Sequence, residues 1–241
     1  MTQGHLLGEL RLPDRYEHLS RELGPDLLRV LVAPPESAET ELTAVAQAIL
    51  SKGRGLLVPI YADSGTGKST LAHNLEHFLP GYYADAVPYT GAISDDSLAA
   101  VAAGVARRSK ADERRVVPLV VDGREGDPPT EAELAAIKRF TRSDGPGSRT
   151  ALLWLETDGD RSSAMADGYE RLAGRPPVTL PLEAAGPPQE TWPTVAVETL
   201  QLANDVGELE SLEESTRTPM SRGSTAPWAI SYPRSPTTSM P

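Results

Sequence analysis

The chain has 241 residues, a formal net charge of -11 at pH 7 and no cysteine. This length fits one large domain with its own core, and without cysteine the chain can form neither disulfides nor thiolate metal sites. The acidic balance argues against binding to nucleic acid or to anionic membranes. No apolar run approaches the roughly 20 residues that cross a bilayer, and the first residues lack the order of a secretory signal, so we expect a soluble cytoplasmic protein.

Residues 1–35 are expected to form an N-terminal leader. A helix is predicted over residues 14–23, stopped by Gly24 and Pro25, while the short apolar stretch 26–32 has no periodicity that decides its type.

The main domain is predicted to span residues 36–183 and to begin with a helix. Ser37 is the predicted N-cap of this helix, because its side chain can accept a hydrogen bond from a free backbone N–H. Apolar residues then recur at helical spacing as far as Leu50, and Gly53 is a natural stop.

From residue 55 onwards, strand-like and helix-like segments alternate. The strand-like segments are residues 55–61, 83–90, 115–122, 150–157 and 178–182. The helix-like segments between them are residues 71–79, 98–109, 134–140 and 162–172. Ser94 is the predicted N-cap of the second of these helices, and Thr130 with Glu133 forms a predicted capping box before the third. The alternation predicts an α/β fold with three layers and a mostly parallel, five-stranded sheet.

Two prolines conflict with this prediction. Pro59 and Pro118 fall inside runs that must form central strands, where proline lacks the N–H that a ladder needs. A position near the start of each strand, before pairing is complete, would allow them.

The pattern weakens after residue 183. Residues 184–214 predict a partial helical extension, with one acidic amphipathic helix or two short ones over 191–214. Residues 215–241 contain no Asp or Glu and many Ser, Thr and Pro, so we expect a disordered tail.

The segment YADSGTGKST at residues 61–70 has the spacing of a phosphate-binding loop. It matches the pattern G-x-x-x-x-G-K-[ST], except that Ala62 replaces the first glycine, which lies at the strand exit rather than against phosphate. Such a loop can bind phosphate because its successive backbone N–H groups point towards the anion. The two glycines let the backbone approach the phosphate closely, and the positive end of the next helix favours its negative charge. Lys68 would reach the β- and γ-phosphate oxygens, and Ser69 would bind Mg²⁺. The expected nucleotide-binding residues are Asp63, Ser64, Gly65, Thr66, Gly67, Lys68, Ser69 and Thr70.

A glycine-rich turn that matches by chance is the alternative. However, a strand-like run precedes the loop and a helix-like run follows it, as the motif requires. Residues 55–80 resemble the Walker A region of P-loop NTPases, and the resemblance implies binding of ATP or GTP together with Mg²⁺. The guanine-selecting pattern N-K-x-D does not occur in the sequence, which favours ATP.

Asp122 ends the strand-like run VVPLVVD, at the edge where ligands gather in parallel sheets. In the resemblance it is the Walker B aspartate, a metal-site residue that holds the Mg²⁺ shell, whereas the alternative is an ordinary turn before Gly123. A whole strand–helix unit separates Asp122 from the loop. This resembles the additional-strand division of P-loop NTPases, including AAA+ and STAND proteins, in which another strand lies between the two in space. The resemblance covers about residues 37–183.

The resemblance also implies an acid for hydrolysis. Gly123 stands where most members have a glutamate, and Glu125 matches the last position of the D-G-x-[DE] form of NACHT-like proteins. Asp127 is the alternative acid, and a solvated loop carboxylate with no catalytic role is the other possibility for Glu125.

Two more catalytic candidates are implied in the same way. Thr157, with Asp158 behind it, matches the polar sensor at the end of a strand in AAA+ cores, although any strand can end in a polar residue. Arg175, with Arg171 behind it, loosely resembles the AAA+ arginine finger, for which a surface arginine is the alternative. Residues 184–214 are too short for the helical lid of these proteins.

The sequence therefore predicts an ATP-binding protein, with ATP and Mg²⁺ as cofactors, that hydrolyses ATP slowly as a switch or within an assembly. Its expected partners are the nucleotide and either another protein or further copies of the chain, with no membrane or direct nucleic-acid contact. A small-molecule kinase is the second hypothesis, with Arg139, Arg142 and Arg149 available to cover phosphates. A nucleotide-binding interaction protein without turnover is the third.

Overall fold

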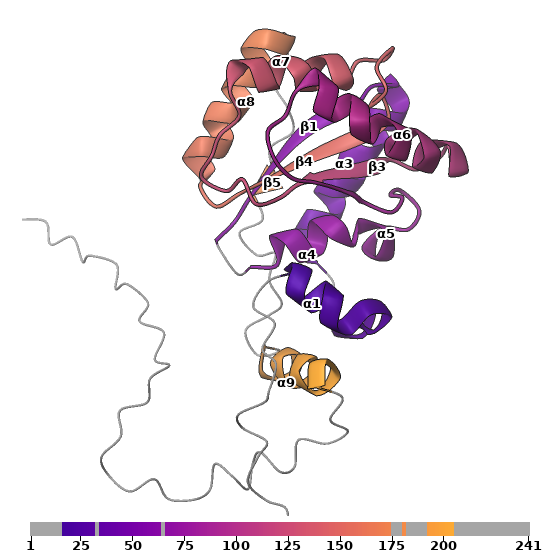
Figure 1. Ribbon diagram of the computed structural model, residues 1–241, viewed down its shortest axis with the longest axis vertical. Helices are drawn as coiled ribbons and strands as arrows, with labels where there is room; N and C mark the ends of the chain where they lie inside the picture. Colours follow the sequence, from indigo (N-terminus) through magenta and orange to yellow (C-terminus); the bar gives the residue numbers. More distant parts are fainter. Residues whose placement is uncertain (1–15, 32–33, 64–65, 175–179, 182–191, 205–241) are drawn as a thin grey trace, which may run out of the picture.

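The computed structural model describes residues 16–31, 34–63, 66–174, 180–181 and 192–204. The strands are β1 (Leu56–Tyr61), β2 (Val87–Tyr89), β3 (Val117–Val121), β4 (Thr150–Glu156) and β5 (Leu180–Pro181). The helices are α1 (Tyr16–Leu23), the 3-10 helix η2 (Gly24–Asp26), α2 (Leu27–Val30), α3 (Glu36–Lys52), α4 (Lys68–His73), α5 (Leu75–Phe78), α6 (Asp95–Ala111), α7 (Glu131–Phe140), α8 (Gly159–Ala173) and α9 (Trp192–Asn204). Helices pack around a central sheet (Figure 1).

The strands form one sheet in the order β2-β3-β4-β1-β5, and every pair is parallel. β4 therefore lies between β1, which leads into the phosphate loop, and β3, which ends next to Asp122. This is the inserted strand that the resemblance to the additional-strand division implied. The predicted parallel α/β fold is confirmed, with β5 described at the edge of the sheet at Leu180 and Pro181.

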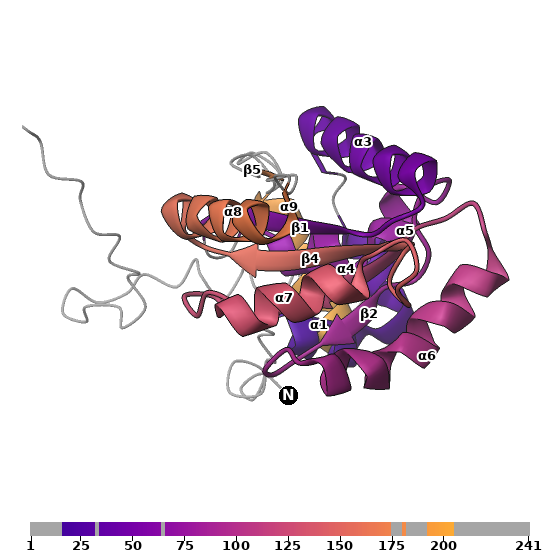
Figure 2. The same cartoon turned by 90° about the horizontal axis from the view of Figure 1, so that it is seen from above.

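The sheet separates two hydrophobic cores. α3 and α4 pack on one face against Val58 and Ile60, whereas α6, α7 and α8 pack on the other face against Leu57, Leu119 and Trp154. Viewed from above, α3 lies on one side of the sheet and α6 and α7 on the other (Figure 2). The three layers follow from strands that are apolar on both faces, as parallel strands covered by helices must be.

Both prolines are paired in register with β4, Pro59 with Trp154 and Pro118 with Ala151. On the other side of β3, β2 begins opposite Leu119, so Pro118, the second residue of β3, precedes that pairing. Pro59 is the fourth of the six residues of β1. The expectation of a position near the start of the strand is therefore confirmed for Pro118, whereas Pro59 lies further along its strand.

Local capping signals predicted several helix ends. Ser94 caps α6 by accepting a hydrogen bond from the N–H of Ser97, and Thr130 forms a capping box with Glu133 at the start of α7. Gly53 ends α3 in the left-handed region, with φ 58.

Other boundaries differ from the prediction. Ser37 is not an N-cap, because α3 begins at Glu36 and the cap position belongs to Pro35, whose backbone is extended. By contrast, α1 ends at Leu23 as predicted, with Gly24 in the left-handed region at φ 50, and Gly24–Asp26 then forms a 3-10 turn that leads into α2. The helix after the phosphate loop is interrupted at Asn74, where φ is -116 and ψ is 23, and continues as α5.

The N-terminal helices and α9 pack together. Buried Leu23 and Leu27 contact the partly buried Leu202 and Ala203 of α9. α1 lies beside α4 (Figure 1), so this packing reaches the helix that follows the phosphate loop. Among the described residues, none of the helices combines the length and apolar character that crossing a membrane requires.

Candidate nucleotide-binding site

The phosphate loop begins at the edge of the sheet where the parallel strands end. Because β1, β3 and β4 run in the same direction, Ala62, Asp122 and Thr157 all follow carboxyl ends at this edge. Gly67 has φ 90 and ψ 15, a left-handed conformation that favours glycine, and α4 begins at the next residue, Lys68. The motif glycine thus turns the chain directly into the helix.

Lys68 is buried, with 4% of its side chain exposed. Its Nζ donates to the backbone oxygens of Ala62, at 2.8 Å, and Asp63, at 3.0 Å, and lies 3.7 Å from Oε1 of Glu125. Thr66 Oγ1 also donates to the backbone oxygen of Asp63, at 2.8 Å. Charged phosphate oxygens accept stronger hydrogen bonds than neutral carbonyls do, so a triphosphate can compete for these two donor groups.

Asp122 lies beside the first turn of α4. His73 Nε2 is 3.5 Å from Asp122 Oδ2, and the N–H of Gly123 donates to Asp122 Oδ1 at 2.8 Å. Burial by itself would raise the pKa of this carboxyl. The His73 ring, the Ser69 hydroxyl and the Gly123 amide outweigh that effect and lower the pKa of Asp122 below its ordinary value. Asp122 is therefore a carboxylate at neutral pH.

The donor set at this edge fits Mg²⁺. Asp122 Oδ2 is buried, with His73 Nε2 beside it at 3.5 Å, and the Ser69 hydroxyl is close enough to act on the Asp122 carboxyl. Mg²⁺ prefers oxygen ligands and is usually held by one or two protein groups together with water and substrate phosphates. Within the described ranges, no three His, Asp or Glu side chains gather to hold a metal ion unaided. Asp122 and Ser69 thus suit a Mg²⁺ ion that is shared with a nucleotide.

The loop after β3 presents Glu125 to Lys68. The other candidate acid, Asp127, is 70% exposed and accepts hydrogen bonds from Nε and Nη2 of Arg124 at 3.0 and 2.7 Å. Arg124 also pairs with the buried carboxylate of Glu133. Of the two acids proposed from the sequence, Glu125 is the one that lies beside the phosphate loop.

Three observations identify the fold. The loop with Lys68 joins β1 to α4, Asp122 follows β3, and β4 lies between those two strands. The chain has an AAA+-like P-loop NTPase fold. No protein-family model matches the sequence, and no curated protein matches it.

This chain is similar, at low sequence identity, to three proteins of known structure. Cdc6p from Pyrobaculum aerophilum is 13% identical with a TM-score of 0.41, and the match covers 68% of this chain and 48% of that one. The ORC2 protein of Aeropyrum pernix, in ADPNP–ADP complexes, is 15% identical with a TM-score of 0.45 and coverages of 76% and 55%. A chain of the E. coli MS115-1 HORMA:CdnC:Trip13 complex is 15% identical with a TM-score of 0.39 and coverages of 78% and 74%.

This chain spans about half the length of the Cdc6p and ORC2 chains that it matches. These low identities and TM-scores carry no information about activity or partners. The AAA+-like fold rests on the strand order and the phosphate loop of the chain itself.

The sensor candidates at the end of β4 have local partners. The hydroxyl of Thr157 donates to Oε1 of Glu156 at 3.3 Å. The carboxylate of Asp158 caps α8, accepting from the N–H groups of Asp160 at 2.8 Å and Arg161 at 3.4 Å. This cap makes α8 begin three residues earlier than the predicted start at residue 162.

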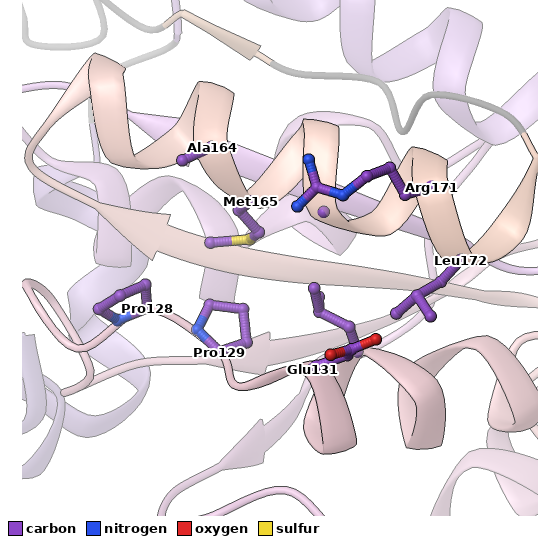
Figure 3. A pocket seen from close by; sticks show the side chains of 9 residues that line it. Pro128, Pro129, Glu131, Ala164, Met165, Arg171 and Leu172 are labelled. Carbon is purple, nitrogen blue, oxygen red and sulfur yellow. The ribbon is translucent and has the colours of Figure 1, made fainter.

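Three predicted site residues, Ser64, Gly65 and Arg175, lie outside the described residues. The alternative finger, Arg171, is exposed on α8. It lines a groove of about 420 Å³ between α7 and α8, where Met165 and Leu172 face Pro129 and Glu131 (Figure 3).

The arginines considered for a kinase lid have other partners. Arg139 pairs with Asp95 at 2.7 Å, and Arg142 pairs with Asp144 at 2.8 Å. Arg149 donates to the backbone oxygen of Glu113. Arg149 directly precedes β4, and Thr141, next to Arg142, accepts a hydrogen bond from the N–H of Gly55 before β1. Both arginines therefore lie where the strands begin, at the edge of the sheet opposite the phosphate loop, and their described contacts give no support to an arginine lid over it.

Glu156 is a site residue that the sequence analysis missed. It is the last residue of β4 and fully buried, and its carboxylate accepts hydrogen bonds from the N–H groups of Thr157 and Gly126. Its backbone oxygen accepts from the N–H of Ala62, at 3.3 Å, in the phosphate loop. The sequence offered one sign of this residue, because Glu156 directly follows the apolar run ALLWL at the end of a strand that is buried on both faces.

His73 was also missed. Its ring stacks on that of Tyr16 in α1, with centroids 4.7 Å apart and planes 5° from parallel. Asn74 Nδ2 donates to the Tyr16 hydroxyl at 3.2 Å. His73 therefore connects the N-terminal helices to Asp122, a contact between distant segments that sequence spacing does not reveal.

Proposed function

We propose that this chain binds ATP with Mg²⁺ at residues 62–70 and hydrolyses it slowly, as a switch or as part of an assembly. The observation that carries the proposal is the position of Glu125 beside Lys68, at the edge of the sheet that also holds Asp122 and Ser69. A phosphate-binding lysine, oxygen ligands for a metal ion and a carboxylate able to act on water are the groups that ATP hydrolysis needs.

Each residue has a defined role in this proposal. Lys68 Nζ would exchange the backbone oxygens of Ala62 and Asp63 for β- and γ-phosphate oxygens. Ser69 and Asp122 would hold Mg²⁺, which supplies positive charge next to the phosphates. Thr70 would contact the α-phosphate. Thr157 is proposed as a sensor of the γ-phosphate, and Arg175 as a finger that adds positive charge, within the chain or between copies of it.

Glu125 would act on the attacking water, either by orienting it or by accepting its proton. Its carboxylate is 37% exposed and already pairs with Lys68 at 3.7 Å. A bound γ-phosphate would compete for the same ammonium and repel the carboxylate, so Glu125 must leave Lys68 before it can serve water. This extra step is the physical reason that we propose slow turnover.

Mg²⁺-dependent phosphate release, with ATP affinity measured in parallel, tests the proposal. Lys68→Ala should weaken ATP binding roughly 10- to 100-fold, because hydrogen bonds to charged groups contribute about 1.5–3 kcal/mol. Glu125→Gln should bind ATP at least as tightly as wild type but release phosphate on the order of 10²-fold more slowly. Glu131→Gln, the same charge change at an exposed position of α7, should behave as wild type. Equal binding and turnover by wild type and Lys68→Ala would contradict the proposal.

A nucleotide-binding interaction protein without turnover is the second candidate. The 37% exposure of the Glu125 side chain favours it, because a carboxylate that is open to solvent is not held in one position against an attacking water. It predicts Lys68-dependent binding of ATP without phosphate release by the wild-type chain. The same two assays therefore separate it from the slow ATPase.

A further inference from the structure

The carboxylate of Glu156 lies at the centre of the proposed site without an assigned role. Its side chain is 0% exposed, and β4, which it ends, lies between the strands that lead to Lys68 and Asp122. A buried carboxylate is costly unless hydrogen bonds and an opposite charge compensate it. The partners that compensate Glu156 therefore show what it holds in place.

The adjacent Thr157 donates its N–H and hydroxyl to Oε1 of Glu156, at 2.8 and 3.3 Å. The other partners are Gly126 and Arg161. The N–H of Gly126 points at both carboxylate oxygens, at 3.1 Å from Oε1 and 3.2 Å from Oε2. Arg161 Nη1, from the first turn of α8, lies 3.7 Å from Oε1. Gly126 has φ 81, and a Cβ atom at this residue would lie 2.9 Å from Arg161 Nη1. The Arg161 side chain can shift away from such a Cβ, so it is the positive φ that favours glycine at this residue.

Gly126 is the neighbour of Glu125, and the residue on the other side is also fixed. The Arg124 guanidinium pairs with the buried Glu133 and lies over the ring of Trp154, with Cζ 4.9 Å from the ring centroid. Glu125 is thus the residue between two held positions, and its own side chain is left to face Lys68. Movement of either neighbour would move the Glu125 carboxylate.

We propose that Glu156 is a positioning residue: it binds the Gly126 N–H and thereby keeps Glu125 beside the phosphates held by Lys68. This inference rests on the proposed ATPase function. Glu156 acts through Glu125 and does not itself contact the nucleotide. Its backbone oxygen also binds the N–H of Ala62, so one residue joins the acidic loop and the phosphate loop at the edge of the sheet.

The proposal predicts an effect on turnover but not on affinity. Glu156→Gln keeps the size of the side chain but loses its charge, which weakens its attraction to Arg161 and to the Gly126 N–H. We expect kcat to fall on the order of 10²-fold, the typical effect of a displacement of about 1 Å at a catalytic group. The Kd for ATP should stay within about twofold, because the groups that bind phosphate are unchanged.

A double-mutant cycle provides the test. Glu156→Gln and Glu125→Gln are made singly and together, and single-turnover phosphate release and ATP affinity are measured for each. If Glu156 acts through Glu125, the double variant is no slower than Glu125→Gln alone. Tyr83→Phe is the control for general destabilisation, because it removes a buried hydrogen bond to the Leu42 oxygen beside the opposite edge of the sheet, and its kcat should match wild type.

If Glu156→Gln does not fold, Arg161→Gln tests the same inference, because it removes the charged partner of Glu156. Arg161 is 44% exposed, so the chain should tolerate its replacement, and the variant should lose turnover only when Glu125 is present. An unchanged kcat in a folded Glu156→Gln or Arg161→Gln variant would overturn the inference, as would equal losses with and without Glu125. Absence of Lys68-dependent turnover in the wild-type chain would instead contradict the proposed function, and the inference with it.

Discussion

Replacing Glu133 with glutamine should destabilise the protein at neutral pH and have little effect in strong acid. Glu133 is 6% exposed, and its oxygens accept hydrogen bonds from the N–H groups of Ile93 and Thr130, both at 2.9 Å, and from Arg124. Burial alone would raise the pKa of this carboxyl. Arg124 and the two amides outweigh burial and lower the pKa of Glu133 from 4.5 to about 2.

The magnitude follows from this lowering. A fall in pKa from 4.5 to about 2 means that the folded state favours the charged carboxylate by about 3 kcal/mol, since each tenfold change in an equilibrium constant is about 1.4 kcal/mol. Because the folded-state pKa lies below the unfolded-state pKa, this stability is complete above pH 4.5 and is lost as the pH falls towards 2. Glu133→Gln keeps the shape but not the charge, so it should lower the free energy of unfolding by about 2–3 kcal/mol at neutral pH.

Urea unfolding of wild type and Glu133→Gln over a pH series measures the effect. Glu131→Gln is the matched control, because it makes the same charge change at an exposed position of the same helical turn and should shift stability by less than about 0.5 kcal/mol. The difference between wild type and Glu133→Gln should shrink below pH 4.5 and be small near pH 2. A Glu133→Gln effect as small as that of the control at neutral pH, or one that does not change with pH, would refute the reasoning.

Two further predictions concern stability. Thr150→Val should raise the free energy of unfolding by about 1 kcal/mol in urea titrations, because the buried Thr150 Oγ1 makes no hydrogen bond; a loss of stability would show that the hydroxyl has a partner. Tyr16→Ala should cost about 1–2 kcal/mol by removing the stacking on His73, whereas Tyr16→Phe should cost less than about 1 kcal/mol because it keeps the stacking and loses the hydrogen bond to Asn74. Equal costs for the two Tyr16 variants in the same assay would mean that stacking does not stabilise this contact.

Features encoded by neighbouring residues were predictable from the sequence. Ser94 and the Thr130–Glu133 pair cap helices through bonds that span three residues, so their signals are local. The parallel sheet followed from the alternation of segments, and a strand between β1 and β3 was what the resemblance to the additional-strand division implied. Local sequence thus predicted the fold class and the phosphate loop, whereas the sequence did not say which strand lies between β1 and β3.

The missed features depend on contacts between distant segments. From the sequence, Glu156 is an ordinary residue at the end of a strand, because its contact with Gly126 forms only in the folded chain. His73 is likewise an ordinary residue of a helix in the sequence, because nothing local indicates that Tyr16 stacks on it. The failed Ser37 cap has a different cause, because Pro35 already supplies the extended backbone that precedes a helix and α3 begins before the serine. Tertiary contacts and competing local signals therefore set the limit of the sequence analysis.

We propose that residues 62–70 bind a nucleoside triphosphate whose Mg²⁺ is shared by Ser69 and Asp122. Isothermal titration with a non-hydrolysable ATP analogue, with and without Mg²⁺, measures this binding. We expect wild type to bind more tightly with Mg²⁺, Asp122→Asn to lose most of this gain, and Lys68→Ala to bind poorly in both conditions. Equal affinity of wild type and Lys68→Ala, or no binding by wild type, would show that this loop is not a nucleotide site.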